Sequence, residues 1–148
     1  MKKSKLVVTI PCLDEAQSLP SVVKSIPKKI KNIQKVEIVA IDDGSKDNTV
    51  QVAKSAGIKH LVVHKRNQGL ARTFNDGLKK ALELKADIIV NIDGDNQYDS
   101  GEIPKLIKPI LAGKADMVLG NRRVWQLSHM PFFKKIGNIL GSWLIRRM

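Results

Sequence analysis

Cysteine and aromatic residues are scarce in this sequence. Cys12 is the only cysteine among 148 residues, so no disulfide can form within the chain, which fits a reducing compartment such as the cytoplasm. Beside a predicted buried strand, it is expected to be a small core residue. Aromatic residues make up 4% of the chain, too few for a protein that reads single-stranded nucleic acid by stacking bases.

Long apolar runs are also absent. No stretch reaches the roughly 18 apolar residues that a membrane-spanning helix needs. The apolar run at residues 6–10 follows a basic start but is too short for a secretory signal, and Asp14 and Glu15 come soon after it. We therefore expect a cytoplasmic protein.

Positive charge is in excess. The chain has 26 Lys and Arg against 14 Asp and Glu, a net charge of +12. Such a balance attracts polyanions, whether nucleic acid, anionic lipid or phosphorylated ligands, without choosing among them. A composition of 43% hydrophobic and 27% charged residues predicts a globular domain with its own core.

Apolar runs alternate with helix-like segments along the chain. Strands are predicted at residues 6–10, 36–41, 60–64, 86–92 and 117–119, and helices at about 18–30, 47–56, 69–85 and 102–112. Pro11 should end the first strand, Pro27 should end or kink the first helix, and Gly57 should end the second. The third helix is predicted to share one apolar face among Leu70, Phe74, Leu78, Ala81 and Leu82. This alternation predicts an α/β fold with a mostly parallel sheet flanked by helices.

Polar clusters follow four of the predicted strands, at residues 11–15, 42–45, 91–99 and 120–123. In open α/β sheets the ligand binds outside the carboxyl ends of the strands. We therefore expect these clusters to gather along one edge of the sheet.

Asp93 and Asp95 form the cluster with the clearest chemistry. Their i, i+2 spacing on extended backbone points both carboxylates the same way, and Gln97 continues the series. Carboxylate and amide oxygens suit Mg²⁺ or Mn²⁺, which would also relieve the repulsion between the acids. The alternative is a solvated turn, but the place of these residues after an apolar strand favours a metal site.

The acids of the second cluster are predicted to differ in role. Asp42 and Asp43 stand at a strand end, where they can accept hydrogen bonds from a ribose hydroxyl or a base N–H. Asp47 is expected to cap the helix that follows.

The remaining clusters are more ambiguous. Asp14 and Glu15 either bind a nucleotide or favour the first helix as capping acids, with equal weight for the two readings. Gly69 allows close approach of the backbone beside Asn67, and Arg72 lies in the first turn of a helix.

Taken together, these motifs resemble the family 2 glycosyltransferases of the GT-A fold. The matching motifs, in the order of the family, are Pro11-x-x-Asp14-Glu15, Asp42-Asp43-x-Ser45-x-Asp47-x-Thr49, Asn67-x-Gly69-x-x-x-Thr73, Asp93-x-Asp95-x-Gln97 and Gly120-x-Arg122. The combination of DxDxQ with a later GxR is most similar to the polyprenyl-phosphate sugar transferases of the dolichyl-phosphate mannose synthase type.

The resemblance implies a GT-A (Rossmann-like) core over residues 1–123 that binds a UDP- or GDP-linked sugar. The nucleotide-binding residues it implies are Pro11, Asp14, Glu15, Asp42, Asp43, Asn67, Arg72 and Asp93. It also implies Mg²⁺ or Mn²⁺ held by Asp93, Asp95 and Gln97, with catalytic roles for Asp95 and Arg122.

The resemblance further implies inverting transfer of the sugar to an acceptor. A polyprenyl phosphate is already anionic, so it needs cations rather than a general base, and Arg122, Lys134 and Lys135 would supply them. Residues 124–148 form a basic amphipathic segment. It is expected either to contact the cytoplasmic face of a membrane peripherally or to pack on protein that this chain does not contain.

Several alternatives stay open. Members of the family continue with another strand, an acceptor loop and a closing helix, so we expect a domain that is incomplete at its C-terminus. The chain is then either a transferase, acting on a lipid phosphate or a saccharide, or a nucleotide-sugar-binding domain without transfer activity. A receiver domain fits poorly, because its paired acids would follow the first strand. No nucleic acid partner is expected, because the acidic clusters would repel its phosphates.

Overall fold

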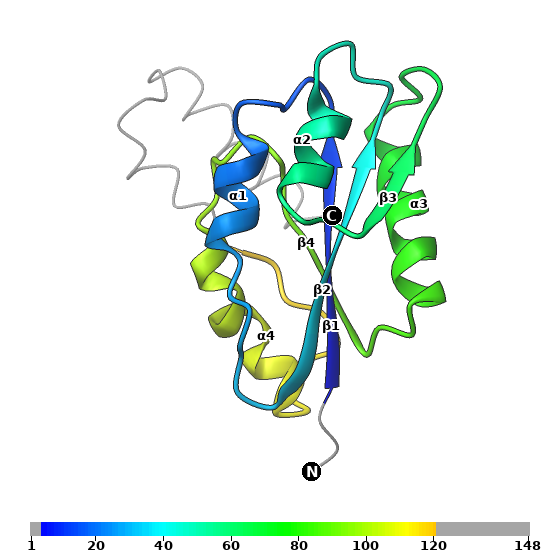
Figure 1. The fold of residues 1–148 in the computed structure, drawn as a ribbon. Coiled ribbons are helices and arrows are strands. Elements are labelled where there is room, and N and C mark those ends of the chain that lie inside the picture. Colours follow the sequence, from blue (N-terminus) through cyan, green and yellow to red (C-terminus); the bar gives the residue numbers. More distant parts are fainter. Residues whose placement is uncertain (1–3, 121–148) are drawn as a thin grey trace, which may run out of the picture. The chain divides into compact units, whose positions relative to one another are not determined.

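The computed structural model describes residues 4–120, which contain one four-stranded parallel sheet (Figure 1). The strands are β1 (Ser4–Cys12), β2 (Ile33–Asp42), β3 (His60–Val63) and β4 (Ile88–Asn91), in the order β3-β2-β1-β4. The helices are α1 (Leu19–Ser25), α2 (Thr49–Ser55), α3 (Leu70–Glu83) and α4 (Ile103–Leu111), with a 3-10 turn, η1 (Ser100–Glu102), before α4. The prediction of a parallel α/β sheet flanked by helices is confirmed.

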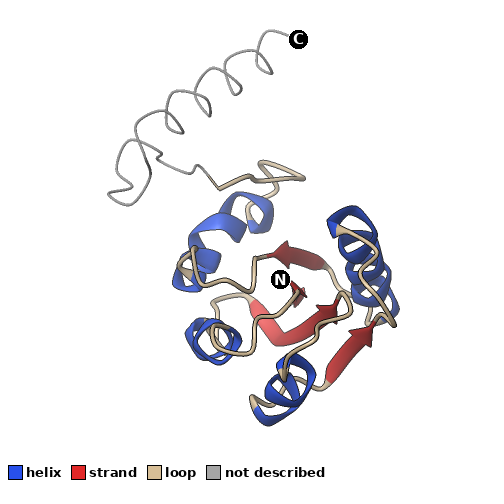
Figure 2. Cartoon of the chain, turned by 90° about the horizontal axis from the view of Figure 1, so that it is seen from above, coloured by secondary structure: helices blue, strands red, loops and turns tan. Residues whose placement is uncertain are grey.

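Helices cover both faces of the sheet. The helices α1, α2 and α4 lie on one face and α3 lies on the other (Figure 2). Alternate residues of β1 serve the two cores: Val8 packs toward α1 and α4, and Val7 packs toward α3, both fully buried. A strand buried on both faces is apolar at almost every position, which explains the run at residues 6–10.

The first strand continues through Pro11, contrary to the prediction. Pro11 pairs with Ile41 of β2, and the register extends to Cys12 and Asp42. On the other side, the pairing of β1 with β4 stops at Thr9. Beyond Thr9 the strand has one neighbour only, so the N–H that proline lacks is not needed for a second ladder.

Two other predicted elements are shorter or missing among the described residues. Helix α1 ends at Ser25, because Pro27 disfavours helical backbone at Ile26, which is extended. Pro27 therefore ends the helix as predicted, and the helix does not reach residue 30. Residues 117–119 form no strand in the described part of the chain. Met117 is 72% exposed, so this short apolar run gains no burial there that would favour a strand.

The face that α3 turns to the sheet also differs from the prediction. The buried positions are Thr73, Gly77 and Ala81, whereas Leu70 and Phe74 remain exposed. A Cβ added at Gly77 would lie 2.9 Å from Cδ1 of Ile41. The small residues therefore let the helix approach the sheet closely, and of the predicted stripe only Ala81 is buried.

Candidate functional site

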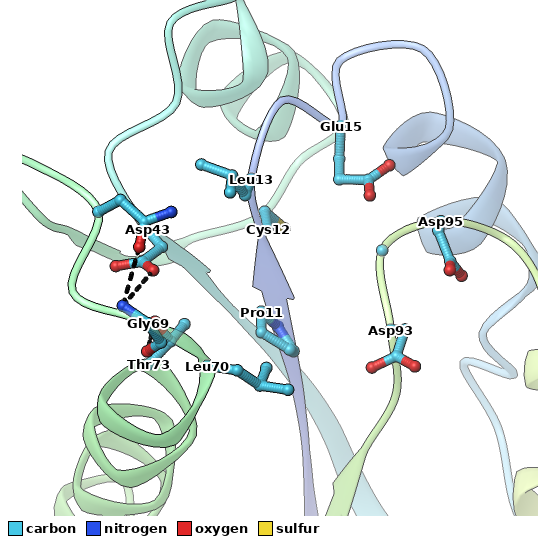
Figure 3. A pocket seen from close by; sticks show the side chains of 12 residues that line it. Pro11, Cys12, Leu13, Glu15, Asp43, Gly69, Leu70, Thr73, Asp93 and Asp95 are labelled. Carbon is cyan, nitrogen blue, oxygen red and sulfur yellow. Dashed lines mark hydrogen bonds between the residues drawn. The ribbon is translucent and has the colours of Figure 1, made fainter.

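A cavity of about 260 Å³ opens where the carboxyl ends of the strands meet (Figure 3). It is lined by Pro11, Cys12, Leu13, Glu15, Asp43, Asn67, Gly69, Leu70, Thr73, Asp93, Gly94 and Asp95. These residues lie at or just after the carboxyl ends of all four strands, so three of the four predicted clusters do share one edge of the sheet. The fourth cluster, with Arg122, begins at the last described residue and otherwise lies outside the described residues, as do Lys134 and Lys135.

The loops after β1 and β2 are joined by hydrogen bonds between side chains and backbone. The Asp14 N–H donates to Ser45 Oγ at 2.9 Å, and Asp14 Oδ1 accepts from the Lys46 N–H at 2.7 Å. The Glu15 N–H donates to Thr49 Oγ1 at 2.8 Å. Asp14 has a left-handed backbone, with φ of 56°, and its side chain does not line the cavity. Its hydrogen bonds therefore join the two loops.

Asn48, not Asp47 as predicted, is the N-cap of α2, and its side chain makes no capping hydrogen bond. Asp47 lies one residue earlier and bonds to the start of the helix. Its carboxylate accepts from the Thr49 N–H at 2.9 Å and from the Thr49 hydroxyl, and it also accepts from the Ala16 N–H at 3.1 Å. The hydrogen bond from the Thr49 hydroxyl contributes most, and together these bonds hold the pKa of Asp47 below its ordinary value.

Asp43 lies at the base of one wall of the cavity. Its Oδ1 accepts from the Gln68 N–H, its Oδ2 accepts from the Gly69 N–H, both at 2.9 Å, and Nδ1 of His64 lies 2.7 Å from Oδ1. Burial of the carboxylate opposes its ionisation, but the hydrogen bonds from His64 and the two amides outweigh it and lower the pKa of Asp43. The residue is therefore an ionised group that fixes the backbone of the loop after β3.

Asp42 is buried next to Asp43 but does not line the cavity. It is 3% exposed, and its Oδ2 accepts from the Ser45 N–H at 3.2 Å. Its Oδ1 is buried without a hydrogen-bond partner. A buried unpartnered carboxylate oxygen is costly, so it is a feature that a bound ligand or water would relieve.

Asp93 and Asp95 both line the cavity, on the side opposite Asp43 (Figure 3). Asp95 Oδ1 accepts from the Gln97 N–H at 3.0 Å, while the Gln97 side chain is exposed and does not line the cavity. Asp99 accepts from the Gly101 N–H at 2.8 Å and so caps η1.

The residues present fit a divalent metal that is shared with a ligand. No group of three or more potential protein ligands occurs among residues 4–120, but two carboxylates line one side of the cavity. Magnesium is usually bound by one or two carboxylates together with substrate phosphates, rather than by a complete cage of protein ligands. The two aspartates provide that donor set.

The other predicted residues divide between the cavity and its surroundings. Asn67 lines the cavity, and its Oδ1 accepts from the Gly69 N–H at 2.9 Å. Arg72 does not line it; its Nε donates to Asp76 Oδ2 at 2.7 Å, one turn along α3. Pro11 and Glu15 line the cavity as expected, and the Glu15 carboxylate accepts from the Ser18 hydroxyl.

Apolar lining was the part of the site that the motifs did not reveal. Leu13 in the loop after β1 and Leu70 at the start of α3, 44% and 69% exposed, line the cavity. A leucine between Pro11 and Asp14 in an otherwise polar cluster is the signal that was available for the first. Cys12 is buried as predicted. Its pKa is raised to about 12, mainly by burial and to a smaller extent by the negative charge of Asp42.

The parallel sheet and the acidic cleft at its carboxyl edge place the chain in the class of open α/β domains with a ligand site at the strand ends. The model of the glycosyl transferase family 2 matches residues 7–145. The chain therefore belongs to this family, as the motifs indicated.

Named relatives agree with this assignment. The UDP-N-acetylglucosamine–dolichyl-phosphate N-acetylglucosaminyltransferase of Methanococcus voltae is 30% identical, over 97% of the chain and 63% of that protein. The dolichol-phosphate mannosyltransferase of Pyrococcus furiosus is 31% identical, over 89% of the chain and 38% of that protein. The chain thus spans less than two thirds of the length of these relatives.

Solved structures share the fold. Glucosyl-3-phosphoglycerate synthase from Mycobacterium tuberculosis, in complex with Mn²⁺, uridine diphosphate and glucosyl-3-phosphoglycerate, superposes with a TM-score of 0.59 at 24% identity. The match covers 73% of the chain and 40% of that protein. Among residues 4–120, no helix combines the length and apolar character needed to cross a bilayer.

Proposed function

We propose that this chain binds a nucleotide-diphospho-sugar in the cavity at the strand ends and acts as a metal-dependent, inverting glycosyltransferase. The observation that carries the proposal is the meeting of Asp93 and Asp95, from the end of β4, with Asp43, from the end of β2, around one cavity. Pro11 and Asn67 line the same space. Asp14, Asp42 and Arg72 stay predictions, because the structure places them outside the lining.

The charge of the cavity supports a requirement for metal. Four carboxylates line it, those of Glu15, Asp43, Asp93 and Asp95, and no lysine or arginine lines it in the part of the chain that the structure describes. A diphosphate would be repelled by this lining unless a cation came with it. Mg²⁺ or Mn²⁺ held by Asp93 and Asp95, with Gln97 assisting, would stabilise the charge on the departing diphosphate as a Lewis acid. The Mn²⁺ and uridine diphosphate of the structural neighbour agree with this.

The proposed acceptor is a polyprenyl phosphate. An acceptor oxygen forms a bond to the anomeric carbon while the bond from that carbon to the β-phosphate oxygen breaks, and the nucleoside diphosphate leaves with the electron pair. A phosphate oxygen has no proton to lose at this step, so no general base is needed, whereas a sugar hydroxyl would need one. The names of two relatives include a dolichyl or dolichol phosphate, which supports this class of acceptor. The proposed place of transfer is the cytoplasmic face of a membrane.

The donor site is tested by calorimetric titration with UDP, GDP and CDP, with and without Mn²⁺. Asp95→Asn should abolish the metal-dependent part of binding, because an amide is a poorer ligand for a hard cation. The matched control is Asp99→Asn on the same loop, which keeps an oxygen that can accept from Gly101 and should leave binding unchanged. Equal binding by the two variants would refute the metal assignment.

A transfer assay separates the enzyme from a domain that only binds nucleotide. The chain is incubated with a radiolabelled UDP- or GDP-sugar and either undecaprenyl phosphate in detergent or a soluble oligosaccharide. Transfer to the lipid phosphate is the expected outcome. Nucleotide binding without transfer to either acceptor would support the binding-domain alternative, and transfer to the oligosaccharide alone would overturn the proposed acceptor.

A further inference from the structure

His64 lies buried behind the cavity, between carboxylates from two different elements. It follows β3 directly and is 8% exposed. Its Nδ1 is 2.7 Å from Oδ1 of Asp43, and its Nε2 is 3.3 Å from Oδ2 of Asp76 on α3. An ionised carboxylate only accepts hydrogen bonds, so Nδ1 is the donor in the contact with Asp43.

The Asp43 carboxylate connects His64 to the wall of the cavity. It accepts hydrogen bonds from the backbone N–H groups of Gln68 and Gly69, and Gly69 is the N-cap of α3. With His64, three donors from the loop after β3 contact a carboxylate that has about four acceptor positions, and the Thr73 hydroxyl also lowers its pKa. Loss of the imidazole donor would leave Oδ1 with Gln68 alone and let the group rotate away from the loop.

Asp76 lies on the other side of the imidazole, where His64 Nε2 is buried without a hydrogen-bond partner among the described residues. The Asp76 side chain is 14% exposed, and it is paired with Arg72 at 2.7 Å and with Lys79 at 3.4 Å. The pKa of Asp76 is lowered, and the hydrogen bond from the Arg72 guanidinium contributes most to this. The hydrogen bond from Nδ1 to Asp43 is therefore the contact that fixes the ring, and it does so toward the cavity.

We infer that His64 is a positioning residue for the donor pocket. It orients the Asp43 carboxylate and, through it, the Gln68–Gly69 backbone, so nucleotide affinity depends on a side chain that does not line the cavity. This inference rests on the proposed function, in which the cavity binds a nucleotide.

Two substitutions at His64 separate its two nitrogens. In His64→Asn the amide nitrogen takes the place of Nδ1 and can still donate to Asp43. In His64→Gln the amide extends to the place of Nε2, toward Asp76, and the donor to Asp43 is lost. A matched control is His60→Gln at the opposite end of β3, where the ring contacts Glu37 at 3.5 Å and does not line this cavity.

The readout is the dissociation constant of UDP or GDP with Mn²⁺, measured beside the unfolding midpoint of each variant. His64→Asn and His60→Gln should bind within about threefold of the unaltered chain, and His64→Gln should bind about tenfold more weakly. A purely structural role would make affinity follow the unfolding midpoint in all variants. Affinity that follows the midpoint, or that is equal in the two His64 variants, would overturn the inference.

A second measurement needs no variant. Saturating the unaltered chain with nucleotide and Mg²⁺ should shift the ring resonances of His64 and the amide resonances of Gln68 and Gly69, and leave those of His60 in place. Nucleotide binding with no change at His64 would overturn the inference alone. No binding of any nucleotide would refute the proposed function, and the inference with it.

Discussion

Replacing Gly44 with alanine should destabilise the chain more than replacing Gly57, and the difference follows from the backbone. Both glycines have left-handed backbone, with φ of +78° and +84°, where a Cβ costs about 1–2 kcal/mol. At Gly57 the added Cβ meets nothing within 4 Å, so only that cost is expected. At Gly44 it would lie 2.5 Å from the carbonyl carbon of Arg66 and 2.7 Å from the Asn67 nitrogen. These are backbone atoms, so no rotamer change relieves the clash, and overpacking adds about 1–3 kcal/mol.

The assay is equilibrium unfolding in urea, followed by circular dichroism. Gly44→Ala should lower the free energy of unfolding by about 2–5 kcal/mol and Gly57→Ala by about 1–2 kcal/mol. Equal losses would refute the steric argument and show that the turn moves away from Arg66 at no cost. Because Asn67 lines the cavity, Gly44→Ala should also weaken nucleotide binding, whereas Gly57→Ala should not.

Two further predictions concern ionisable groups. Hydrogen bonds from Lys35 and, to a smaller extent, Lys5 lower the pKa of Glu37 from 4.5 to about 2. The ionised carboxylate therefore stabilises the fold above pH 4.5, and this stabilisation is lost as the pH falls toward 2. Glu37→Gln should cost on the order of 1–3 kcal/mol at pH 7 and less at pH 3 in urea unfolding; a loss independent of pH would contradict this. Cys12, with its pKa raised to about 12 by burial, should resist a thiol reagent at pH 8 until urea unfolds the chain. Rapid labelling of the native chain would show that the thiol is accessible.

Much of the fold was predictable, because strands buried on both faces have an unambiguous pattern. Val7 and Val8 are both fully buried, on opposite faces of the sheet, and the run at residues 6–10 is apolar for that reason apart from Thr9. The gathering of the polar clusters at one edge of the sheet was also predictable, because the carboxyl ends of parallel strands lie on the same side. The metal assignment of Asp93 and Asp95 stays a prediction, to which the structure adds a cavity with no basic residue in its lining within the described part of the chain.

The orientation of α3 was not predictable from hydrophobicity. A hydrophobic stripe selects the largest apolar residues, such as Leu70 and Phe74, whereas close contact between a helix and a sheet selects the smallest, here Gly77 and Ala81. The role of Asp43 was also out of reach, because its three donors become neighbours only when the loop after β3 folds back on the end of β2.

The central position of β1 has a consequence for the order in which the site assembles. β1 pairs with β2 over nearby stretches of the chain, but it meets β4 through residues such as Thr9 and Asn91, which are 82 positions apart. Closing the longer loop costs more chain entropy, so β4 should join the sheet last. During synthesis, the half of the cleft built around Asp43 would then form first, and Asp93 and Asp95 would complete it only when β4 docks.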